Sequence, residues 1–194
     1  MSFVKRLAAL LTAVLLLLTA TACTEPYPEL REYSEALGAS APVAATLESS
    51  LDTELGELGA EYIATWSGGA LTVTYTKDKL AELTPSSTPG SLLTKEEGTA
   101  TVAADGTVTG TVSTLVVNVL TCKIILDGEK ITYTEANGEL EFTVTAENTE
   151  TVLGVDIGYD VKAKIKLSDE SVESISLAYT ADSGEATMTC NFEY

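Results

Sequence analysis

From Ala70 to the C-terminus, apolar residues recur at every second position, and this period constrains the fold more than any other feature of the sequence. Leu71, Val73 and Tyr75 alternate with threonines, and apolar residues alternate with aspartates and lysines over 157–167. Successive side chains of a strand point to opposite faces of a sheet, so this pattern predicts strands with one buried and one solvated face.

Tight turns punctuate the alternating segments, because Gly adopts positive φ without strain and Asn or Asp tolerates it. The turns are predicted at Asp105-Gly106, Asp127-Gly128, Asn137-Gly138 and Asp182-Ser183-Gly184. The predicted strands cover residues 99–104, 107–113, 115–126, 130–136, 139–147, 155–167, 174–181 and 185–194. The apolar phase slips between Val112 and Leu115, which predicts a bulge or bend. Short strands joined by short turns predict a sequential antiparallel meander.

Helical spacing appears mainly before this region. Leu30, Tyr33 and Leu37 predict a helix over 29–37, and a short helical turn is expected over 79–83. A second helix is predicted after Pro42, with glutamates opposite an apolar stripe of Val43, Leu47, Leu51, Leu55 and Leu58.

The expected fold class is therefore α+β but mainly β. We predict a curved antiparallel meander sheet, partly closed or shaped as a half-barrel, with one or two N-terminal helices packed on it. Residues 41–194 are expected to form this helix-plus-sheet structure as a single domain, a usual size for one core.

The N-terminus has the order of a secretory signal. Lys5-Arg6 precede an apolar run over 7–18, and small residues follow as far as Ala22. The rival interpretation is an uncleaved membrane helix, but the run is shorter than the roughly 20 apolar residues that cross a bilayer. We expect residues 1–22 to be a cleaved signal peptide, so that the protein is exported.

The end of this signal, Ala20-Thr21-Ala22-Cys23, resembles the lipobox of bacterial lipoproteins and departs from it at Ala20, where the family prefers Leu. The resemblance implies that Cys23 carries a lipid and that residues 23–40 tether the domain to the outer face of the cell membrane or of another envelope membrane. The alternative is an ordinary signal peptide that ends beside a cysteine.

The acidic composition leaves the anchoring to the lipid. Loss of Lys5 and Arg6 with the signal leaves 9 basic residues against 29 acidic ones, a net charge of −20. Such a chain is repelled by anionic head groups and by nucleic acid, so we expect no nucleic-acid partner.

The sequence contains no histidine, which excludes Ser-His-Asp and Cys-His catalysis and histidine-ligated metal sites. Paired carboxylates could still hydrolyse a glycosidic bond, but acidic residues are too plentiful for any pair to stand out. Asp105 and Asp127 are isolated turn residues rather than parts of a calcium loop. We expect no enzyme, no catalytic residues, no cofactor and no dedicated metal site, with a carboxylate-based hydrolase as the remaining exception.

Cys122 and Cys190 remain after lipidation of Cys23, and both lie on apolar faces of predicted strands. Two cysteines in an exported domain suggest a disulfide. Buried free thiols that pack as small apolar groups are the equally weighted alternative.

At family level the chain resembles the small lipoproteins common in Gram-positive bacteria. Its helix-then-meander layout is also similar to half-barrel lipoprotein carriers, which hold an acyl chain between sheet and helix. We therefore expect a tethered, non-catalytic binding module for an apolar ligand or a protein partner. The alternative is a structural or interaction lipoprotein of the cell envelope that binds no small molecule.

Overall fold

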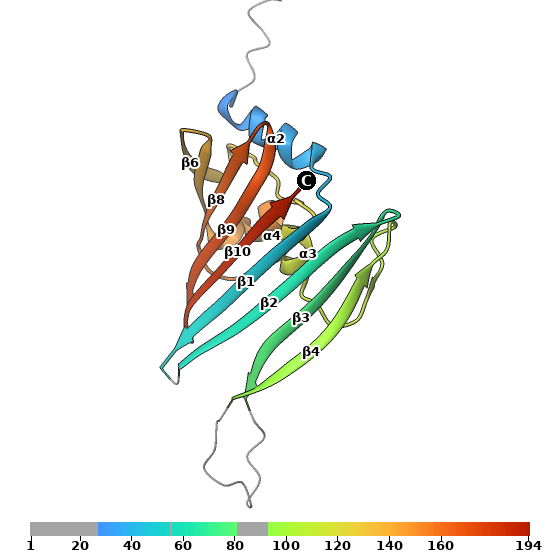
Figure 1. Cartoon of the computed structure of the whole chain (residues 1–194). Coiled ribbons are helices and arrows are strands. Elements are labelled where there is room, and N and C mark those ends of the chain that lie inside the picture. The colour runs from blue at the N-terminus through green and yellow to red at the C-terminus, as the bar shows by residue number, and fades with distance from the viewer. Residues whose placement is uncertain (1–26, 55, 81–92) are drawn as a thin grey trace, which may run out of the picture.

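The computed structural model describes residues 27–54, 56–80 and 93–194, and these ranges are mainly β-structure. Ten antiparallel strands form one curved sheet in the order β5-β4-β3-β2-β1-β10-β9-β8-β7-β6 (Figure 1). The strands are β1 (Ala44–Thr53), β2 (Gly56–Ser67), β3 (Ala70–Leu80), β4 (Leu93–Val102), β5 (Val108–Thr109), β6 (Ile131–Ala136), β7 (Glu139–Val144), β8 (Val161–Ser168), β9 (Ser171–Ala181) and β10 (Gly184–Glu193). The expected fold class is confirmed, and the sheet stays open because its edge strands β5 and β6 are not neighbours.

The strands follow one another as a meander, with one departure in the middle of the sheet. The first strand, β1, pairs with β2 on one side and with the last strand, β10, on the other. In this central pair Leu47 lies opposite Cys190 and Ala45 lies opposite Phe192. The sheet therefore consists of two five-stranded meanders that are joined by the first and last strands of the fold.

The helix predicted over 29–37 is confirmed as α2 (Glu29–Ala39). Leu30, Tyr33, Ala36 and Leu37 are buried on its inner face, and the exposed Arg31 Nε donates to Glu35 Oε1 at 2.7 Å. The helix packs over β8 and β9. The predicted one-sided pattern therefore matches the face that the helix buries.

The second predicted helix, over 43–58, is wrong, because this stretch forms β1 and the start of β2. Ala45 and Leu47 alternate with the partly or fully exposed Thr46 and Glu48, which is a strand pattern. A period of two continues over 58–66, where every second residue is apolar or aromatic. Pairing on both sides of β1 outweighs the helical propensity of its Leu, Ala and Glu residues.

The strand predicted over 115–126 is also wrong, since α3 (Thr114–Leu120) occupies its first half. The Ser113 side chain accepts a hydrogen bond from the Val116 amide and so caps the helix, although valines favour strands. The apolar phase slip at 112–115, predicted as a bulge or bend, coincides with the start of this helix.

Other predicted strands differ from the structure mainly at their ends. Of the strand predicted over 107–113, only β5 forms, and the 3₁₀ helix η1 (Ala146–Asn148) and α4 (Thr149–Leu153) intervene before β8.

Three of the four predicted turns join strands. Asn137-Gly138, with φ of 56° and 75°, joins β6 to β7, and the turns at 105–106 and 182–184 also join strands. Asp127-Gly128 lies instead in an irregular segment before β6. The helical turn predicted over 79–83 begins at Lys79, which belongs to β3, and residues 81–83 lie outside the described ranges.

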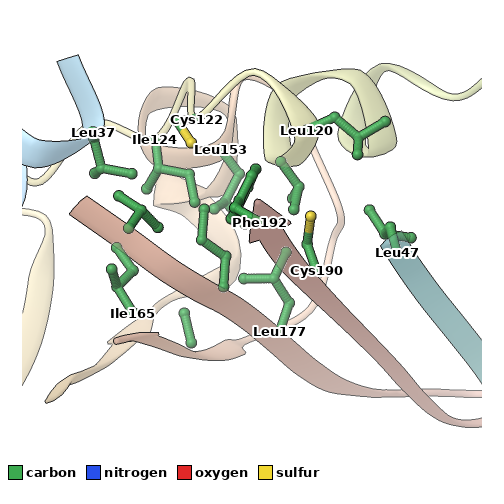
Figure 2. Packing of buried hydrophobic residues seen from close by; sticks show 14 of the residues in the cluster. Leu37, Leu47, Leu120, Cys122, Ile124, Leu153, Ile165, Leu177, Cys190 and Phe192 are labelled. Carbon is green, nitrogen blue, oxygen red and sulfur yellow. The ribbon is translucent and has the colours of Figure 1, made fainter. Parts of the chain in front are cut away.

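The core lies between the concave face of the sheet and the helices. Leu37 of α2, Leu120 of α3 and Leu153 of α4 point toward sheet residues such as Ile165 and Leu177 (Figure 2). These five residues are 0–5% exposed. These helices thus cover the sheet over one end of its concave face.

Candidate functional site

The residue expected to carry the lipid, Cys23, lies outside the described residues, so the structure places only the other two predicted site residues. Cys122 follows α3 with a φ of 53°, and Cys190 lies on β10. Both are buried in the core cluster and both thiols are free in the structure (Figure 2). Their pairing stays a prediction, which non-reducing mass spectrometry of the mature protein tests.

The buried environment of the two thiols raises their pKa values. Burial raises the pKa of the Cys122 thiol to about 11, although a hydrogen bond with Ser40 acts in the opposite direction. Burial raises the pKa of Cys190 further, and the neighbouring Cys122 adds to this effect. Because the thiolate is the nucleophile, these raised pKa values lower the reactivity of both thiols at neutral pH.

The concave face of the sheet is covered at one end and open at the other. α2, α3 and α4 gather over the end where β10 finishes, and none of these helices lies over the end that carries the β1–β2 and β9–β10 turns (Figure 1). Along β1 the inward-facing Leu47 is fully buried, whereas Leu51, four residues on, is partly exposed. The core therefore opens into an uncovered surface along the same strands.

We name this surface the concave trough and define it by six partly exposed side chains: Leu51, Leu58, Tyr62, Leu115, Tyr179 and Met188. A hollow of about 330 Å³ lies between these residues at the edge of α3. A second hollow of about 900 Å³ continues toward the two hairpin turns and shares Leu51 and Leu58 with the first. The trough therefore runs from beneath α3 to the open end of the sheet.

Two of the six trough residues, Tyr62 and Tyr179, each lie beside a second tyrosine ring. The rings of Tyr62 and Tyr75 lie 6.0 Å apart, and those of Tyr159 and Tyr179 stack at 6.3 Å. Tyr75 itself is buried, because Gly98 lies opposite it on β4 and has no side chain to hold the ring away. Burial raises the pKa of the Tyr62 hydroxyl, which the nearby Lys77 ammonium partly offsets. The Tyr62 hydroxyl therefore stays protonated and uncharged at physiological pH.

One ion pair lies beside the rings. Lys77 Nζ donates to Glu96 Oε1 at 2.9 Å and lies 5.2 Å from the centre of the Tyr75 ring. The hydrogen bond raises the pKa of Lys77 and lowers that of Glu96, so both groups are charged at neutral pH. Lys79 Nζ lies 3.9 Å from the other oxygen of the same carboxylate, so Glu96 is shared by two ammonium groups.

The sequence pattern singles out none of the trough residues as a site. It predicts a helix for Leu51 and Leu58, and the position of Tyr62 depends on strand order. The alternation over 58–66 was the available signal for the correct face of β2.

The opposite, convex face is polar. Threonines and serines alternate there with charged residues, and Lys164 Nζ contacts both Glu139 and Glu141, at 3.2 and 2.7 Å. Its hollow of about 620 Å³ is lined by β6–β10 and includes Thr132, Thr143 and Lys162. The convex face thus suits contact with water or a polar partner.

The described residues can be compared with the requirements of a metal centre and of a membrane-spanning helix. Within residues 27–54, 56–80 and 93–194, no group of three or more Cys, Asp or Glu side chains is placed to hold an ion. In the same ranges, no helix has the length and apolar character needed to cross a membrane.

No protein-family model matches the sequence, and no curated protein matches it. Among solved structures, the chain is similar to a redesigned beta barrel, mFAP1, bound to DFHBI, at 8% identity and a TM-score of 0.22. The match covers 76% of this chain and 92% of that chain. A likeness this distant carries no argument about the ligand or the family of this protein.

Proposed function

We propose that this chain is an exported lipoprotein, tethered through a lipid on Cys23, whose domain binds an apolar ligand in the concave trough. The tether is supported by the order of the N-terminal sequence and its resemblance to a lipobox. Ligand binding is supported by the open end of the concave face.

The uncovered trough is the observation that carries the binding proposal. A folded domain gains free energy by covering contiguous apolar surface, so an apolar patch left open marks a binding site. The two hollows, of about 330 and 900 Å³, have the size of small-molecule sites. The layout agrees with the half-barrel carriers that the sequence resembles, in which the ligand lies between sheet and helix.

The binding proposal is tested at Leu58, which lines both hollows. Leu58→Glu introduces a carboxylate into the apolar trough, and we expect it to abolish lipid that co-purifies with the full-length protein in native mass spectrometry. Ile63→Glu is the matched control, because Ile63 is 49% exposed on the convex face of the same strand. Full ligand occupancy in Leu58→Glu, or no ligand in the unmodified protein, would contradict the proposal.

The tether is tested by Cys23→Ala. We expect this variant to move from the membrane fraction into the medium or periplasm, because a net charge of −20 provides no attraction to anionic lipids. Fractionation followed by immunoblotting measures the change, with Cys122→Ala as the control that keeps the lipidation site. Retention of Cys23→Ala in the membrane would overturn the assignment.

A second candidate function uses the convex face. Its broad threonine-rich and charged surface favours a structural or interaction lipoprotein that contacts an envelope component without a small ligand. Affinity capture from envelope extract tests this role, and recovery of no partner above background counts against it.

A further inference from the structure

Resting on the proposed function of the concave trough, we infer that its ligand is a cationic amphiphile, an apolar body that carries an ammonium or guanidinium group. The inference concerns the larger hollow, of about 900 Å³, at the open end of the sheet. Its lining separates into an apolar part and an acidic part.

The apolar part consists of Leu51, Leu58, Leu93 and Ala181. The acidic part consists of two exposed carboxylates of the hairpin turns, Glu54 and Asp182. Asp52 and Glu57 also border the hollow, but strand alternation turns their side chains toward the convex face. No lysine or arginine lines this hollow among the described residues. A ligand that fits both parts has an apolar body and a positive head group.

The one basic side chain that lines either hollow does not reverse this preference. Lys77 lines only the smaller hollow, where it donates to Glu96 at 2.9 Å, and Lys79 lies 3.9 Å from the other oxygen of the same carboxylate. The Lys77 ammonium also lies 5.2 Å from the centre of the buried Tyr75 ring. Lys77 is therefore held by groups of the protein itself and adds no positive charge to the lining of the larger hollow.

Electrostatics over a longer range act in the same direction. Carboxylates of both turns line one hollow, so a cation bound there is attracted by both turns. The chain as a whole carries an excess of acidic residues, so its field steers cations toward it. A fatty-acid anion would instead place a negative charge beside those of Glu54 and Asp182.

Three photoreactive probes with the same alkyl chain isolate the contribution of the head group. One carries trimethylammonium, one an uncharged maltoside and one a sulfate, and each is added to the full-length protein in nanodiscs of zwitterionic lipid. Mass spectrometry then locates the labelled peptides. We expect the cationic probe to label residues 51–62 and 177–188 several-fold more than the uncharged probe, with the sulfate probe lowest.

Two double variants remove the same charge from different faces. Glu54→Gln/Asp182→Asn neutralises the turns that border the hollow, and Glu48→Gln/Glu61→Gln neutralises two exposed residues that lie opposite each other on the convex face. We expect the cationic preference to fall only in the first variant. In the unmodified protein, the preference for the cationic probe should also decline as salt is added, and this measurement requires no variant.

The outcomes separate the two proposals. Equal labelling of the trough by all three probes overturns the cationic ligand and leaves apolar binding intact. Equal loss of preference in both double variants also overturns it, because net charge alone would then be responsible. Absence of trough labelling by every probe overturns apolar binding itself.

Discussion

Thr149 is fully buried although its side chain is polar. Its hydroxyl donates to the Ala146 carbonyl at 2.9 Å and accepts from the Ile157 amide at 3.1 Å. One hydroxyl therefore connects the start of α4 to the irregular segment that leads into β8. Buried polar atoms are tolerated when both their donor and acceptor capacities are used, as they are here.

Thr149→Val keeps the shape of this side chain and removes both hydrogen bonds. We expect the free energy of unfolding to fall by about 1–3 kcal/mol, because the Ile157 amide is left without its partner. Urea denaturation measures the change. The exposed Thr151 of the same helix provides the control, since Thr151→Val should alter stability by no more than about 0.5 kcal/mol.

Asp78 holds two strands together where their backbone pairing ends. The β2–β3 ladder stops at Ala60 and Lys77, and one residue further the Gly59 amide donates to Asp78 Oδ2 at 2.9 Å. Lys95 of β4 also contacts Asp78 Oδ1 at 2.9 Å. The bond from Lys95, and after it the bond from Gly59, lowers the pKa of the Asp78 carboxyl.

This lowered pKa predicts a pH-dependent contribution to stability. A carboxyl with a lower pKa in the folded state binds fewer protons there, so its contribution is present above the unfolded pKa of about 3.9 and is lost as the pH falls through the folded value. Asp78→Asn should therefore destabilise the protein at pH 7, and its difference from the unmodified protein should shrink below about pH 4.

Urea denaturation across this pH range measures the difference. Lys95→Met should reproduce most of the effect, because Lys95 is the main cause of the lowered pKa. A difference that grows on acidification would contradict this role of Asp78.

At the scale of elements, local pattern identified structure where one physical preference dominated. The alternating segments in the C-terminal half became strands, and the turns with Asn or Asp before Gly were placed correctly at three of four sites. The helix prediction for 43–58 is wrong because its leucines fit a helical stripe as well as a strand. Pairing of β1 with β2 and with β10, which comes from the far end of the chain, decides between helix and strand.

The strand prediction for the valine-rich segment of α3 is wrong for the opposite reason. Its β-branched residues predict a strand, yet Val116, Val117 and Val119 are buried in the core on a short capped helix. Position over the sheet, rather than intrinsic propensity, determines this element.

Ser113 should contribute to that outcome through its cap. Ser113→Ala removes the acceptor of the Val116 amide, which lies 3.3 Å from the Ser113 hydroxyl, and should lower stability by about 1 kcal/mol. Denaturation in urea measures the loss, and Thr111→Ala in the preceding exposed segment is the control. An unchanged stability for Ser113→Ala would show that tertiary packing alone maintains α3.

For the whole molecule, the sequence predicted a curved meander sheet with N-terminal helices packed on it, but not how much of the sheet the helices cover. The trough requires β1, β2, β9 and β10 to lie side by side and the helices to stop short of their turns. Both conditions depend on residues more than a hundred positions apart, such as Leu51 and Ala186. The N-terminal signal is local in sequence, which is why Cys23 could be nominated and the trough could not.

The pairing of β1 with β10 also has a consequence for the time at which the protein can fold. A chain delivered N-terminus first, by a ribosome or through a membrane channel, presents β1 early and β10 last. Until the final residues emerge, β1 has a partner on only one side and the two meanders remain unconnected. The core is therefore completed only after the C-terminal strand has emerged. Until then the chain is not fully folded and can still pass through a channel.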